Sequence, residues 1–268
     1  MRIFSPSSGG GGRMHRDMDE TIQGWPYEPQ PGEVLAREVR ARDGRMVIQI
    51  RVELGVLQLE VVGRPDGTRP HGFVTFLDYL RQRASGRDQA PGGKVPSWRM
   101  APEHCIEADR EFVQYYHRRV AWLALHQFEM ALLDADHTLA LMDFVRQHGI
   151  DDEYIASHER FRGLVLFQRT QAAAALALER RRPEEAIDAI HEGLVQLAAL
   201  QNAALGEPDR SEPSYQALIE QLRNSEQQIR KNFAVEKTLR EQLDEAIAVE
   251  DYERAARIRD QIRDRARR

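Results

Sequence analysis

The chain has 268 residues, of which 41% are hydrophobic and 30% charged, and its formal net charge is −5 at pH 7. This length suits one or two domains with a sizeable core, and the acidic balance argues against a generally basic nucleic-acid surface. No apolar run approaches the ~20 residues of a membrane-spanning helix, so we expect a cytoplasmic protein. Cys105 is the single cysteine, which argues against a disulfide framework and a thiolate zinc cluster.

The N-terminal third predicts a disordered leader followed by a small module. Residues 1–23 begin with a Gly- and Ser-rich stretch without apolar periodicity, so we expect disorder there. Within the module, residues 24–84, apolar residues alternate with polar ones around Ile48 and change phase near Gly55, which predicts strands with a bulge or bend at that glycine. A helix over 46–62 is the competing interpretation, because the same apolar residues also form a helical stripe.

A turn-rich loop closes this module. Arg64, Arg69 and His71 are crowded between turn residues, so they are candidates to bind an anion or an acidic side chain of a partner. The alternative is that they only cap the strand layer and the next helix. A short helix is predicted at 73–83, followed by a flexible linker at 85–101.

Residues 102–205 predict a body of four amphipathic helices, the third of which begins after Asp151 or Asp152 and reaches to about Arg181. The segments around Ala131 and Ala186 echo each other, and both are similar to the helix-turn-helix unit of tetratricopeptide repeats, with these alanines at the small position of the second helix. Their offset of about 55 residues exceeds the ~34 of that family, so the resemblance is a divergent one. It implies stacked helical pairs.

Residues 212–236 predict a long connecting helix with a coiled-coil-like stripe that is interrupted at Ser225 and Glu226. We interpret it as a semi-rigid arm that holds the last segment away from the body.

The last segment, residues 237–268, predicts two short amphipathic helices folded back on each other. Val249 to Asp251 interrupt the apolar stripe, and Asp251 can cap the second helix. Ala255 and Ala256 allow the two helices to approach closely. A hairpin this small has too little core to be stable alone. We therefore expect it to complete its burial against a partner, with Tyr252 reaching outward.

This segment resembles the UVR motif, the helical hairpin shared by the UvrB and UvrC subunits of the bacterial excision nuclease. The residues that carry the resemblance are Leu239, Leu243, Ala246, Ile247, Glu250, Asp251, Tyr252, Glu253, Ala255, Ala256, Arg259, Asp260 and Ile262. The resemblance implies binding to another protein, often a second copy of the hairpin. The motif also occurs in regulators of Clp proteases and in activators of a protein arginine kinase, although the latter carry cysteines that this chain lacks.

The sequence offers only scattered candidates for catalysis or metal binding. Asp134 and His137 are three residues apart on a predicted helix, and His104 adjoins Cys105. Acidic and His side chains on such a helix are more often hydrogen-bonded across a helix pair than bound to a metal, and adjacent residues do not face each other. We expect no metal, no cofactor and no enzymatic activity. An enzyme with its site around the loop of Arg64, Arg69 and His71 is kept as an alternative.

We therefore expect a mainly α fold: a tetratricopeptide-like array, a small N-terminal β-containing module, and a C-terminal hairpin on a long helix. The function expected is that of an adaptor that binds protein, without membrane or direct nucleic-acid contact; accessory roles in nucleotide excision repair or in Clp-protease and stress-response regulation are the alternatives. The partner-binding residues expected are Leu243, Ile247, Tyr252, Ala255, Ala256, Arg259 and Ile262.

Overall fold

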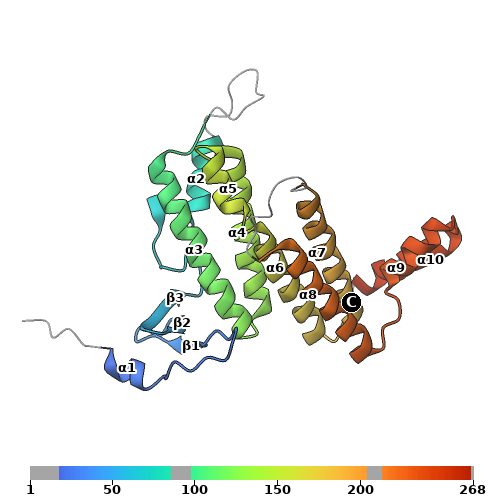
Figure 1. Ribbon diagram of the computed structural model, residues 1–268, viewed down its shortest axis with the longest axis horizontal. Coiled ribbons are helices and arrows are strands. Elements are labelled where there is room, and N and C mark those ends of the chain that lie inside the picture. Colours follow the sequence, from blue (N-terminus) through green and yellow to red (C-terminus); the bar gives the residue numbers. More distant parts are fainter. Residues whose placement is uncertain (1–17, 86–97, 204–212, 267–268) are drawn as a thin grey trace, which may run out of the picture.

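The computed structural model describes residues 18–85, 98–203 and 213–266, and it is mainly helical (Figure 1). Most of the predicted leader lies outside these ranges. Its last part does not match the prediction of disorder, because Asp19–Gln23 form a short helix, α1.

A three-stranded antiparallel sheet forms the N-terminal module, in the order β1 (Ala36–Arg40), β2 (Met46–Val52) and β3 (Gly55–Glu60). The strand interpretation is therefore correct and the helix over 46–62 is wrong. The phase change at Gly55 is neither a bulge nor a bend. The chain reverses there, since Val52 pairs directly with Gly55 across a tight turn.

The sheet is held against the helical body by an apolar cluster. Ile48, Ile50 and Leu59 pack with Trp122 and Ala131 of the first two long helices. Helix α2 (Phe76–Ser85) follows a single 3-10 turn, Pro70–Gly72. Residues 86–97 of the predicted linker lie outside the described residues. The remaining part is not a free linker, because Trp98 and Met100 are buried in the core beneath α2.

The body consists of the antiparallel pairs α3 (Pro102–Ala124) with α4 (Phe128–His148) and α6 (Arg162–Glu179) with α7 (Pro183–Ala203), and α4 packs against α6. The single third helix expected from the sequence is in fact two. The short helix α5 (Asp152–Glu159), capped by Asp151, is joined to α6 by a turn. Tyr154 and His158 of α5 contact Asp109 of α3, and these contacts hold α5 as a helix separate from α6.

Both alanines of the repeat-like segments, Ala131 and Ala186, are fully buried between helices. Close packing also explains Gly193, where a Cβ would lie 2.2 Å from the Thr170 hydroxyl oxygen of α6. The likeness to tetratricopeptide repeats itself stays a prediction.

Helix α8 (Tyr215–Phe233) differs from the expected arm. Its apolar face, which includes Leu218, Leu222 and Ile229, is buried in one core with Ile187 and Leu197 of α7. The helix therefore closes the body, and the C-terminal hairpin of α9 (Leu239–Ala248) and α10 (Tyr252–Ala266) projects from that end of the molecule (Figure 1).

Candidate partner-docking hairpin

Local capping sets both helices of the hairpin. Thr238 caps α9: its hydroxyl oxygen accepts the backbone N–H of Glu241 at 3.3 Å, and the Glu241 carboxylate accepts the backbone N–H of Thr238 at 2.7 Å. Asp251 caps α10, as predicted, by accepting the backbone N–H of Arg254 at 3.0 Å. The antiparallel hairpin expected from the sequence is confirmed.

The hairpin has a small core of its own. Ala246, Ala255 and Ile258 are buried, and Leu239, Leu243 and Ile262 pack around them half-buried. The small side chains of Ala246 and Ala255 let α9 and α10 approach closely. Of the expected partner-binding residues, Leu243, Ala255 and Ile262 therefore belong to this internal core, and Ala256 is half-buried beside it.

Other apolar side chains of the hairpin point into solvent around its turn. Ile247 is 51% exposed, Tyr252 68% and Val249 71%. Arg259 is also exposed, near Asp260. Val249 was missed in the sequence because it was counted as part of the break in the stripe; its apolar side chain between charged neighbours was the available signal. We call Ile247, Val249 and Tyr252 the hairpin tip.

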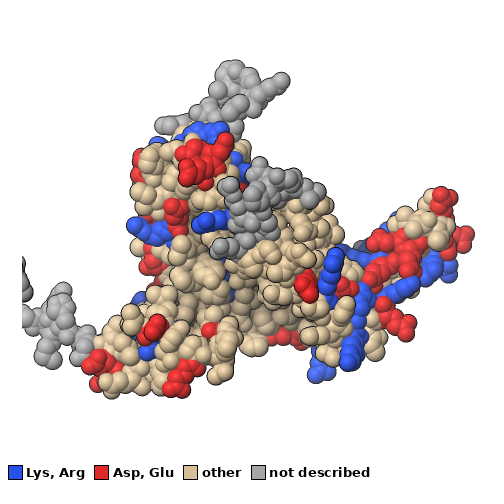
Figure 2. Space-filling view, in the orientation of Figure 1, with Lys and Arg blue, Asp and Glu red and all other residues tan. Residues whose placement is uncertain are grey.

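Charged side chains cover the rest of the hairpin, with Lys/Arg and Asp/Glu interspersed (Figure 2). Such a surface keeps the projecting helices hydrated and leaves the tip as the apolar part of an otherwise polar element. The tip and the internal core thus divide the predicted partner-binding residues into an outward and an inward group.

The hairpin is joined to the body through Thr238, whose side chain is fully buried. Its hydroxyl donates to the Asp188 carboxylate of α7 at 2.9 Å while it caps α9, so one group serves both the helix and its attachment. Arg240 lies 3.6 Å from the same carboxylate. Partial burial raises the pKa of Asp188.

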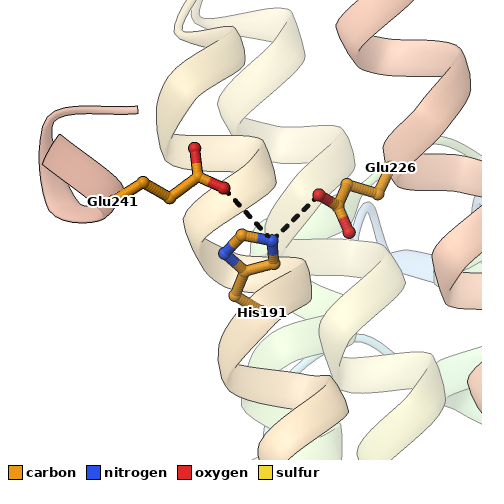
Figure 3. A group of neighbouring side chains, drawn as sticks. All are labelled: His191, Glu226 and Glu241. Carbon is orange, nitrogen blue, oxygen red and sulfur yellow. Dashed lines mark hydrogen bonds and ion pairs between the residues drawn. The ribbon is translucent and has the colours of Figure 1, made fainter. Parts of the chain in front are cut away.

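A second polar group joins α7, α8 and α9 (Figure 3). His191 Nε2 lies 2.9 Å from Glu226 Oε1 and 3.8 Å from Glu241 Oε1. Arg230 donates to the same two oxygens, at 2.8 Å and 2.5 Å. Partial burial acts to raise the pKa of Glu241, but hydrogen bonds from the Thr238 backbone and from Arg230 outweigh it and lower that pKa.

One imidazole and two carboxylates are donors that suit a transition metal. Here Arg230 already pairs with both carboxylates, so these four side chains act as an ion-pair network that fastens α9 to α8. The sequence gives no signal for this network, because its members are far apart along the chain and follow no ligand spacing.

The loop after β3 does not bring its three candidate residues to one opening. Arg64 is buried and pairs with Glu107, with Asp66 at 3.2 Å and with Glu111 at 3.9 Å. Arg69 and His71 are exposed instead and line a pocket beside α2, where the His71 ring stacks on Tyr79. Anion binding by this loop stays a prediction.

The candidates for a metal pair also face different partners. Asp134 accepts two hydrogen bonds from Arg118, at 2.9 Å and 2.7 Å, whereas His137 lies 3.0 Å from Glu111. Cys105 is buried, which raises the pKa of its thiol. The Arg118–Asp134 and His137–Glu111 pairs hold α3 against α4.

Comparison with known proteins yields one match. The sequence model of the UvrB/uvrC motif matches residues 237–264, so the chain contains a UVR motif. No curated protein and no solved structure matches the chain. Among the described helices, none combines the length and the apolar character that crossing a bilayer would require.

Proposed function

We propose that this UVR-containing chain is a non-enzymatic adaptor of the cytoplasm that binds another protein through its C-terminal hairpin. The UVR motif mediates protein–protein interaction in UvrB and UvrC, and the match at residues 237–264 is consistent with the same use here. Two of the titratable residues considered for catalysis are engaged with other side chains: Asp134 pairs with Arg118 and His137 with Glu111. This favours a structural role for them.

The observation that carries the proposal is the exposed hairpin tip. The hairpin buries three small or medium apolar side chains in its own core and leaves Ile247, Val249 and Tyr252 more than half exposed. Covering each of these by a partner would contribute about 1 to 2 kcal/mol at ~25 cal/mol per Å² of apolar surface. A tyrosine at such a place is a frequent anchor, because its ring buries a large area and its hydroxyl can stay hydrated.

The test is a comparison of captured proteins. Affinity purification of the tagged full chain, read by quantitative mass spectrometry, is carried out for the wild type and for Tyr252→Asp. We expect the variant to lose specific partners at least tenfold, because a carboxylate cannot be buried at an apolar contact. Val195→Asp, at an exposed site on α7, is the matched control for the change in charge.

Capture of the same proteins by the wild type and by Tyr252→Asp would refute the proposal. Analytical ultracentrifugation of both forms separates the two kinds of partner: concentration-dependent dimers of the wild type that Tyr252→Asp abolishes identify a second copy of the hairpin as the partner.

An accessory role with the excision nuclease is the second candidate, favoured by the UvrB/uvrC motif. A deletion strain that is sensitive to ultraviolet light and is restored by the wild type but not by Tyr252→Asp would assign the adaptor to repair. Unchanged ultraviolet survival would remove that assignment and leave other pathways, including Clp-protease regulation.

A further inference from the structure

Another surface of interest lies on the body, where α3 meets α5 and the start of α6; these helices are far from the hairpin in Figure 1. Between α3 and the corner of α5 and α6, a cavity of about 520 Å³ opens to solvent. Its apolar wall includes Phe112 of α3 and Phe161, Leu164 and Val165 at the start of α6. We call this cavity the α3–α5 groove.

Exposed apolar side chains extend the groove along α3: Val113 belongs to its lining, and Ile106 lies beyond it. Ile106 is 62% exposed and Val113 is 50% exposed. They are seven positions apart, so they lie on one face of the helix. Tyr116 follows on the groove side. From Ile106 to Tyr116 the stripe is about 15 Å long, which is more than a small metabolite covers and suits an elongated occupant.

Inside the groove, the side chain of Arg119 carries a charge that its neighbours do not neutralise. The residue is 1% exposed, donates to Gln168 at 2.7 Å and to Thr138 at 2.8 Å, and has no carboxylate within 4.0 Å in the described part of the chain. Burial lowers the pKa of Arg119 to about 10, so it remains protonated at neutral pH. A buried charge with only neutral partners is costly, and a nearby anion would offset that cost.

A second positive charge at the groove is that of Arg160, which stands at the rim over the Phe161 ring. Burial lowers the pKa of His117, which lines the wall, so its imidazole adds no charge at neutral pH. The one acidic residue of the lining, Asp109, already accepts from the Tyr154 hydroxyl at 2.9 Å and pairs with His158 at 3.1 Å. The groove therefore combines an apolar wall with unneutralised positive charge.

We propose that the α3–α5 groove binds an acidic peptide segment of a partner protein, with a large apolar side chain against Phe112 and Phe161 and a carboxylate directed toward Arg119. Charge complementarity selects an acidic segment, and the length of the exposed stripe selects a peptide. With the hairpin at the other end, the chain then has two docking surfaces and can bring two proteins together.

The test uses a random 12-residue peptide library displayed on phage and selected on the full-length chain. We expect enriched peptides that combine Asp or Glu with Leu, Phe or Trp. The most enriched peptide, labelled with fluorescein, is then titrated by fluorescence polarisation. Val113→Glu should weaken its binding at least tenfold, because the variant removes an apolar contact and adds a repelling charge.

Controls separate this surface from the hairpin. Val195→Glu carries the same change on an exposed site of α7 and should bind like the wild type, as should Tyr252→Asp. Arg160→Glu should bind about tenfold more weakly. The proposal is overturned if no peptide is enriched, if the enriched peptides lack acidic residues, if Val113→Glu binds as well as Val195→Glu, or if Tyr252→Asp abolishes binding.

Discussion

The attachment of the hairpin depends on one hydroxyl group, which makes Thr238→Val an informative change. Valine keeps the shape of threonine and has a methyl group in place of the hydroxyl. Two interactions of the buried side chain are then lost: the cap on the Glu241 backbone N–H and the hydrogen bond to Asp188. Thr238→Ser is the matched control, because serine retains the hydroxyl.

The two losses can be estimated separately. Removal of an N-cap hydroxyl costs about 1 kcal/mol, and loss of a hydrogen bond to a charged group costs about 1.5 kcal/mol. Together they destabilise the docked α9 by about 2.5 kcal/mol, which corresponds to a roughly 70-fold change in its opening equilibrium. Helices α3 and α4 share no contact with this site, so their stability should not change.

Hydrogen–deuterium exchange resolves these regions of the chain. In Thr238→Val, the backbone amides of α9 should exchange about 70-fold faster than in the wild type, and those of α4 at the wild-type rate. Thr238→Ser should stay within severalfold of the wild type. Equal exchange in α9 for the valine and serine variants would show that the hydroxyl does not hold the hairpin in place.

Three further changes test the packing and the charges. Gly193→Ala should lower the free energy of unfolding by about 1 to 3 kcal/mol in urea titration, because the new methyl group meets Thr170; an unchanged midpoint would contradict the close α6–α7 contact. Asp134→Asn should cost about 3 kcal/mol in the same assay, since Arg118 is left buried without its carboxylate; a loss below about 1 kcal/mol would count against the pair. The pKa of Asp188 is raised in the folded state, so its contribution to stability is complete below the unfolded value of 3.8 and is lost as the pH rises through the folded pKa. Asp188→Asn should reduce the pH dependence of the protection of the α9 amides between pH 3.8 and the folded pKa of Asp188. Identical pH profiles for the variant and the wild type would contradict this expectation.

Where the structure agrees with the predictions from the sequence, the interactions that determine it are local. The hairpin is the clearest case: helical spacing of apolar residues, the cap at Asp251 and the break around Val249 all act within a few residues. The alternation around Ile48 predicted strands for the same reason. Each of these signals lies within one turn or one strand pair.

The errors of prediction have a common physical cause. Helix α8 was expected to stand free, although its stripe is buried on α7, because a stripe does not reveal which surface covers it. Trp98 and Met100 were assigned to a linker since their neighbours in sequence are polar, yet both fill the core beneath α2. The phase change at Gly55 was interpreted as a bulge or bend, because only strand pairing shows that the chain reverses there.

The sequence by itself therefore determined the mainly helical class, the hairpin and its UVR character, because helix periodicity and capping are properties of neighbouring residues. Only the tertiary structure decided which apolar side chains remain exposed at the hairpin tip and which charges meet around His191 and Arg230. It also decided that Arg119 lines a groove without an ion-paired carboxylate among the described residues. These outcomes depend on distances between residues far apart in the chain, and packing of whole helices sets those distances.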